Sequence, residues 1–176
     1  MILGTDCETT GLPHEDPDLL EVALVILEDD LSIRAQASWL MPCDPVASWT
    51  KATDYVRTMH TQNGLWQELY FASQGPQRTM AQVGDEIVNW CAHYNVYPCC
   101  GPMFGQGIAF DREILQMRLP SVRKMWNHRV IDVSGLKFMA KIWYGLQYTS
   151  KEEHRALADI LETVECLRWL RREMFR

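Results

Sequence analysis

The first quarter of the chain consists largely of apolar runs interrupted by polar breaks, as in consecutive strands joined by turns. The runs predicted as strands cover 1–6, 19–30 and 31–42. The second run ends in an acidic turn, and Pro42 stops the third because proline cannot donate to a strand ladder. We interpret the three runs as an antiparallel meander.

From Ser48 onward the apolar residues recur every three to four positions, which is the period of a helix. Two short apolar runs, 99–105 and 128–133, interrupt this period and are predicted as buried strands. Pro76 lies near the start of the longest central helix, a position that tolerates proline. The predicted helical segments are 47–60, 64–71, 76–94, 109–119, 134–143 and 150–175.

This order of elements, three strands followed by helices that alternate with single strands, predicts an α/β fold. We expect a mixed central sheet with helices on both faces. The chain has 176 residues and shows no internal repeat, low-complexity segment or linker, so a single domain over 1–176 is expected.

Composition and charge narrow the class of protein. The sequence has no run of about 18 apolar residues and no secretory leader before the first strand, so a cytoplasmic protein without a membrane span is expected. The six cysteines form no C-x-x-C motif, which favours reduced, buried thiols over a zinc site. A net charge of −6 argues against a protein that coats long nucleic acids by electrostatic attraction alone.

Four carboxylates are candidates for metal chemistry. Asp6 and Glu8 are two residues apart at the end of the first predicted strand, so they point to the same face. Asp111 follows the fourth strand and Asp159 lies in the last helix. Because ligands gather beyond the carboxyl ends of strands, we expect the four to converge on one crevice. Such a cluster suits two hard divalent cations about 4 Å apart, bridged by Asp6, which can clamp both oxygens of a phosphoryl displacement.

His154 precedes Asp159 by five residues, and on a continuous helix that spacing turns two side chains roughly 140° apart. Ser150 and Glu153 have the spacing of a capping box for a helix that starts there. We instead interpret His154 as lying on a mobile segment before the regular helix, where it acts as general base toward an attacking water. An imidazole with a pKa near ~6.5 suits that task. The alternative is an exposed residue without a role.

Three stretches, DCETTGL at 6–12, FGQGIAFDREIL at 104–115 and HRALADI at 154–160, resemble in order and spacing the motifs of the DEDDh family of 3′→5′ exonucleases. The resemblance implies a ribonuclease-H-like exonuclease fold and two divalent ions, Mg²⁺ or Mn²⁺. Further similarity at 57–65 and 128–137 is to oligoribonuclease, which degrades short oligoribonucleotides. By this resemblance the metal ligands are Asp6, Glu8, Asp111 and Asp159, and the general base is His154.

The same resemblance implies a set of substrate-binding residues. Leu12 would wedge between bases, Tyr55 would line a base pocket followed by His60, and Arg129 with Ser134 would hold a 5′ phosphate. Thr9, Gly11 and Gln106 belong to this set through their motifs. Structural alternatives exist for several: Leu12 could cover a loop, Tyr55 could belong to the core, and His60 could cap a helix.

The sequence departs from the family pattern at several places. Gly105-Gln106-Gly107 replaces Gly-Asn-Ser before Asp111, and His128 stands where oligoribonuclease contributes a tyrosine across its dimer. The first motif, ETTGL, is equally close to that of proofreading exonucleases. These departures concern the substrate and leave the metal ligands in place.

The favoured function is a metal-dependent 3′→5′ exoribonuclease that degrades dinucleotides and short oligoribonucleotides to nucleoside 5′-monophosphates. The resemblance further implies a homodimer. One alternative keeps the chemistry and changes the substrate to single-stranded DNA or longer RNA 3′ ends. The other is a catalytically inactive nucleic-acid-binding module, which is disfavoured because all five catalytic residues are present.

Overall fold

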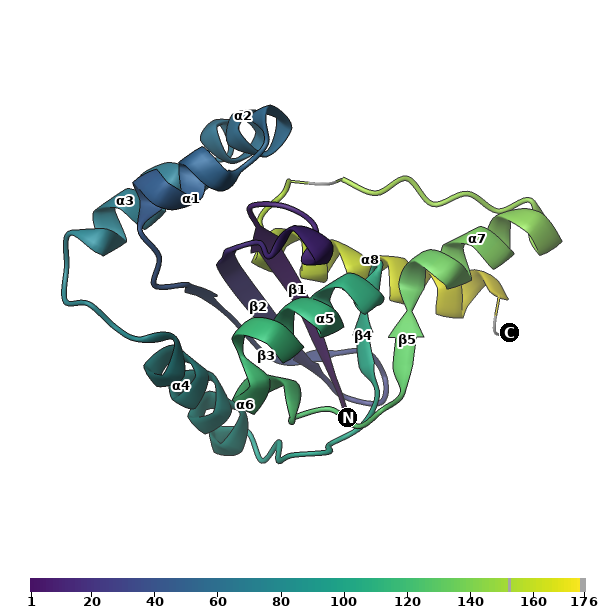
Figure 1. The fold of residues 1–176 in the computed structure, drawn as a ribbon. Coiled ribbons are helices and arrows are strands. Elements are labelled where there is room, and N and C mark those ends of the chain that lie inside the picture. Colours follow the sequence, from purple (N-terminus) through teal and green to yellow (C-terminus); the bar gives the residue numbers. More distant parts are fainter. Residues whose placement is uncertain (152, 175–176) are drawn as a thin grey trace.

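The computed structural model describes residues 1–151 and 153–174 and is built around a five-stranded mixed sheet (Figure 1). Its strand order is β3-β2-β1-β4-β5, in which β1, β2 and β3 pair antiparallel, while β4 lies parallel to both β1 and β5. The predicted meander and mixed sheet are therefore confirmed. The strands are β1 (Ile2–Thr9), β2 (Leu19–Leu27), β3 (Ile33–Leu40), β4 (Met103–Gly105) and β5 (Val130–Asp132).

Strand β2 is buried along its whole length because helices cover both faces of the sheet. Alternate residues such as Val22 and Leu24 belong to the core cluster under the helices α4 (Met80–His93), α5 (Ile108–Arg118) and α6 (Pro120–Arg123). The intervening residues, such as Ala23 and Val25, pack against helix α8 (Ala156–Met174) on the opposite face. This two-sided burial explains why β2 appears in the sequence as a nearly continuous apolar run.

The same alternation on β1 decides where the carboxylates lie. Leu3 and Cys7 pack in the cluster that contains α5, whereas Gly4, Asp6 and Glu8 take the intervening positions and face α8. Gly4 is required by close packing, since a Cβ there would lie 2.2 Å from the ring of Phe104 on β4.

Three short helices form a layer beside the sheet, upper left in Figure 1. They are α1 (Pro45–Lys51), α2 (Asp54–Gln62) and α3 (Leu65–Ser73), so the predicted segment 47–60 is two helices, separated at Thr53, whose side chain caps α2. The long central helix α4 begins at Met80 rather than at Pro76. Thr79 and Gln82 form a capping box at its start, which fixes the boundary.

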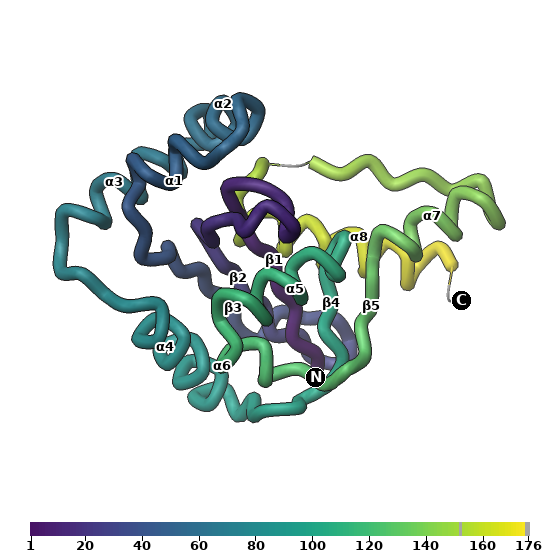
Figure 2. The backbone as a smooth tube through the Cα atoms, in the orientation of Figure 1, coloured from purple at the N-terminus to yellow at the C-terminus, as the bar shows by residue number. Residues whose placement is uncertain are grey.

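The last helix also begins later than the predicted range of 150–175. Helix α7 (Val133–Tyr144) is followed by residues 145–151 and 153–155, which are not helical and run back toward α2 before α8 starts at Ala156 (Figure 2). His154 thus precedes the regular helix, as expected, and Ser150 does not cap it. The predicted end at 175 lies outside the described residues. Among the described residues, no helix is long and apolar enough to span a membrane.

Candidate active site

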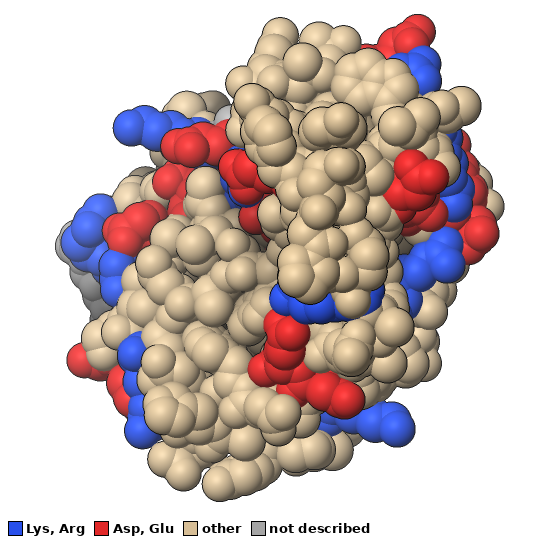
Figure 3. Space-filling model, turned by 90° about the vertical axis from the view of Figure 1, so that its left-hand side faces the viewer, with Lys and Arg blue, Asp and Glu red and all other residues tan. Residues whose placement is uncertain are grey.

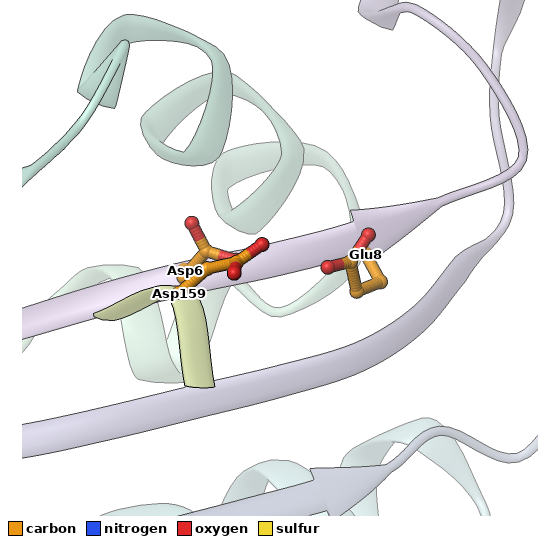
Figure 4. Close-up of side chains that lie close together, drawn as sticks. All are labelled: Asp6, Glu8 and Asp159. Carbon is orange, nitrogen blue, oxygen red and sulfur yellow. The ribbon is translucent and has the colours of Figure 1, made fainter. Parts of the chain in front are cut away.

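Asp6, Glu8 and Asp159 form a cluster of carboxylates at the carboxyl end of the central strand. Carboxylate oxygens of the three residues all lie within 4.8 Å of one another, and in the described part of the chain they form the one group with this geometry. Asp6 and Glu8 project from β1 and Asp159 from the first turn of α8 (Figure 4). The packing of α8 against the sheet therefore brings together residues that are about 150 positions apart in the sequence.

Asp111 approaches this cluster from the other side of the sheet. It lies in the first turn of α5 and is almost completely buried, and its carboxylate interacts with Cys7 on β1. Of the neighbouring charges, Asp111 is the one that raises the pKa of Asp6 most. The structure therefore places Asp111 close to Asp6, although its oxygens lie outside the group of three.

Burial and mutual repulsion raise the pKa values of these carboxyl groups. The pKa of Glu8 rises to about 8, chiefly through burial and then through Asp159 and Glu21. Burial raises the pKa of Asp111 to about 7, and burial with the charge of Asp111 raises that of Asp6 well above its ordinary value. Carboxylates held so close together repel one another, and a bound cation would offset that repulsion.

The His154 segment is attached to this cluster by a backbone hydrogen bond. The N–H of Glu153 donates to Asp159 Oδ1 at 2.9 Å. His154 is half-buried and has a φ of +52°, in the left-handed region that histidine seldom adopts. The residue next to His154 therefore contacts a candidate metal ligand directly.

His60 is the best buried of the predicted substrate-binding residues. Its side chain is 0 % exposed, and its Nε2 lies 3.6 Å from Glu8 Oε2. Burial lowers the pKa of His60 to about 4. In this structure His60 faces Glu8 rather than solvent.

The loop after β1 carries Thr9, Gly11 and Leu12. The Thr9 hydroxyl donates to the Gly11 carbonyl at 2.8 Å, and the Leu12 N–H donates to Glu15 at 2.7 Å, in the short 3-10 helix Pro13–Glu15. These bonds fix the loop while leaving the Leu12 side chain 53 % exposed. Leu12 is thus presented to solvent a few residues beyond Glu8.

The remaining predicted substrate-binding residues lie around the site at different distances. Tyr55 is 68 % exposed on α2. Ser134, at the start of α7, accepts the Gly107 N–H at 2.9 Å, and Gln106 bonds to Thr163 and Lys137. Arg129 is exposed at the opposite, amino end of β5. Arg129 and Ser134 are therefore separated by the length of that strand.

Comparison with curated proteins identifies relatives over nearly the full chain. An oligoribonuclease from Cutibacterium acnes is 33% identical over 176 residues, covering 97% of this chain and 84% of the relative. One from Streptomyces avermitilis is 31% identical over 174 residues, with the same two shares. The chain belongs to the oligoribonuclease family. The predicted assignment to the DEDDh exonucleases, most like oligoribonuclease, is thereby confirmed, and so is the predicted enzyme class, a 3′→5′ exonuclease.

Solved structures support the exonuclease fold of this oligoribonuclease-family chain. Exonuclease I from Methylocaldum szegediense superimposes with a TM-score of 0.71 at 13% identity, covering 99% of this chain and 41% of that one. An E. coli exonuclease I–ssDNA complex gives 0.67 at 13% identity. The chain thus spans about two fifths of these exonucleases, and the likeness confirms the predicted ribonuclease-H-like fold. The chain matches no model of a protein family.

Sequence reasoning missed two residues that this oligoribonuclease-family site depends on structurally, Glu21 and Arg155. Glu21 is buried on β2 directly opposite Glu8, and Arg155 binds it from the residue after His154. Glu21 lies in the second predicted strand and Arg155 lies within the third motif. Arg155 and Glu21 are 134 positions apart, and no local sequence pattern predicts a contact over that separation.

Proposed function

We propose that Asp6, Glu8, Asp111 and Asp159 hold two divalent cations, and that His154 accepts a proton from the water that attacks the 3′-terminal phosphodiester. The observation that carries this proposal is the convergence of carboxylates from β1 and α8, with the backbone next to His154 bonded to one of them. In an oligoribonuclease-family chain this convergence is the arrangement that phosphodiester hydrolysis needs.

The residues present fit a pair of Mg²⁺ or Mn²⁺ ions. Both ions prefer carboxylate oxygens as ligands. The raised pKa values of Glu8 and Asp111 support this proposal, because a bound cation would favour the ionised form of both groups. When bound, such ions stabilise the attacking and leaving oxygens of an in-line displacement. Asp6, whose pKa both Asp111 and Glu8 raise, would share both ions in this proposal.

The protein's own side chains have separate tasks in this proposal. His154 removes a proton from water, because a neutral imidazole is an efficient base at neutral pH. Glu153 holds Asp159 in position through its backbone N–H. His60, buried against Glu8, orients that carboxylate.

For the substrate we propose short single-stranded RNA, with dinucleotides preferred. Leu12 and Tyr55 are exposed and can contact bases, and stacking on an aromatic ring tolerates any base. On the face shown in Figure 3, where α3 and α4 lie, lysines and arginines are interspersed with acidic residues and form no continuous basic track. A long strand would gain little from that face.

Single-stranded DNA or longer RNA remains the second candidate. The observation that favours it is the fold shared with E. coli exonuclease I in complex with ssDNA. The homodimer and the cytoplasmic location stay predictions, and analytical ultracentrifugation would test the first.

The deciding experiment compares three 5′-labelled substrates in Mg²⁺ or Mn²⁺: a diribonucleotide, a twenty-nucleotide RNA and DNA of the same sequence. We expect complete conversion of the diribonucleotide to monophosphates and slow trimming of the others. Faster cleavage of the long RNA or the DNA would keep the catalytic site and refute the dinucleotide preference. No metal-dependent cleavage of any substrate would refute the proposed chemistry.

A further inference from the structure

We propose that Glu21, Asn63, Glu68 and Arg155 form a latch that positions His154 for catalysis. These four side chains join β2 and the α2–α3 pair of helices to the backbone on both sides of His154. They are positioning residues, and the inference rests on the general-base role proposed for His154.

Arg155 is the centre of the latch. Its guanidinium donates two hydrogen bonds to Glu21, both at 3.1 Å, and two to Glu68, both at 2.8 Å. A guanidinium bound by two carboxylates through four bonds is fixed in both position and plane. Because Arg155 follows His154 directly, this fixes one end of the peptide that carries the imidazole.

Glu21 anchors the latch in the sheet. It is buried on β2 and lies opposite Glu8 in the β1–β2 register. Its Oε2 also accepts the N–H of Ala156 at 3.1 Å, at the start of α8. A single carboxylate therefore holds both Arg155 and the first residue of the helix that presents Asp159.

Asn63 holds the other side. Its side-chain amide donates to the carbonyl of His154, and a weaker contact of 3.4 Å reaches the carbonyl of Glu153. Its Oδ1 accepts the N–H of Leu65 at 3.1 Å, which ties it to the start of α3. The His154 carbonyl is thus bound by the segment between α2 and α3.

The backbone of His154 indicates what the latch does. A histidine with a φ of +52° keeps this conformation only where surrounding contacts hold it there. Asn63 supplies such contacts to the carbonyls of His154 and Glu153, and Arg155 supplies them at the next residue. Losing them would release the segment into the extended conformations that histidine prefers, and His154 would move away from the carboxylates.

Two variants test the latch without removing its buried anchor. Asn63→Asp keeps the acceptor for Leu65 and loses the donor to His154, and Glu68→Ala removes the exposed partner of Arg155. Asn63→Asp adds a negative charge and Glu68→Ala removes one. A fall in kcat that both variants share therefore reports the position of His154 rather than a change in charge. The matched control is Glu86→Gln on α4, which removes the charge from an exposed ion pair with Arg78.

We expect both variants to lower kcat on a diribonucleotide by about 10- to 100-fold, with KM within about twofold of the wild type, because small misplacements of catalytic groups have effects of that size. Glu68→Gln, which keeps an acceptor, should recover part of the loss. Hydrogen–deuterium exchange of the peptide 148–158 should rise, while that of β1 stays constant. The Glu86→Gln protein should match the wild type in every measurement.

Unchanged kcat, or unchanged exchange of 148–158, in both variants would overturn the latch. A rise in KM at constant kcat would also overturn it, by assigning these residues to substrate binding. His154→Ala, measured beside them, separates the two proposals. Near-normal turnover of His154→Ala would refute the general-base role, whereas an inactive His154→Ala beside fully active latch variants would refute the latch alone.

Discussion

The Nε2 of His60 lies 3.6 Å from Oε2 of Glu8, inside the protein, and the pKa values of both groups depart from their ordinary values. Burial lowers the pKa of the imidazole to about 4 and raises that of the carboxyl to about 8. In the metal-free protein the two groups are therefore a neutral pair. Binding of a cation would ionise Glu8 beside a neutral His60.

The first prediction concerns the stability of the metal-free protein. Glu8, with a folded pKa of about 8 against 4.5 unfolded, binds more protons when folded, so the free energy of unfolding falls as pH rises through that window. The pKa of His60 is lower in the folded protein, so its contribution to the free energy of unfolding rises with pH between about pH 4 and 6.5. Over that range it offsets the loss that comes from one carboxyl group. From pH 6.5 to 8 we expect a net loss of roughly 2 kcal/mol, measured by urea denaturation in EDTA.

The same titration repeated in Mg²⁺ is the control. A cation favours the ionised carboxylates, so the loss between pH 6.5 and 8 should be smaller with the metal than without it. Stability that increases over this range in EDTA would contradict the raised pKa of Glu8.

Asp159→Ala should reduce turnover by roughly 10³-fold or more, since the charge stabilisation supplied at a metal site is worth several kcal/mol. The fold should persist, because the substitution relieves repulsion with Asp6 and Glu8. Calorimetric titration with Mn²⁺ should show weaker binding. Glu165→Ala on the same helix, which removes a surface pair with Arg168, is the control, and a near-normal rate for Asp159→Ala would refute the two-metal site.

Tyr55→Ala should raise KM for a diribonucleotide by about 5- to 150-fold, corresponding to the ~1–3 kcal/mol of one base stacked on an aromatic ring. Tyr70→Ala is the matched control, since Tyr70 is also an exposed tyrosine on the neighbouring helix α3. Equal effects from the two substitutions would mean that Tyr55 forms no base platform.

Arg129→Ala should weaken binding of short 5′-phosphorylated substrates by about 10- to 150-fold, the ~1.5–3 kcal/mol of a charge-assisted hydrogen bond, and should affect long substrates less. Lys124→Ala, another exposed cation nearby in the sequence, tests for a general loss of charge. Arg129 and Ser134 lie at opposite ends of β5. The phosphate-binding role of Arg129 is therefore tested by how the effect of Arg129→Ala depends on the length of the substrate. Equal loss on short and long substrates would contradict a phosphate-binding role.

The sequence predicted the sheet well because its strands carry strong local signals. Strand β2 is apolar at every position except Glu21, and Pro42 lies just beyond β3. The start of α4 was placed at Pro76 although Thr79 and Gln82, the residues of its capping box, were visible in the sequence. The capping box decides where α4 starts, because its two side chains bond to the backbone N–H groups at the first turn.

The site was predictable only in part, because its residues meet through tertiary packing. The alternation of β1 was enough to pair Asp6 with Glu8. The approach of Asp111 from the α5 face, with Cys7 as its partner, depends on how the helices cover the sheet. The four bonds of Arg155 join residues 87 and 134 positions away, and such distant partners leave no periodic trace.

Strand β1 lies between β2 and β4, with helices on both of its faces, whereas α2 and α3 lie beside the sheet. Substitutions on the exposed surface of α2 and α3 can therefore change that surface while the strand that carries Asp6 and Glu8 keeps its packing. Asn63 and Glu68 are the exceptions on this adaptable surface. Substitutions at these two positions would alter the rate of the reaction through the placement of His154.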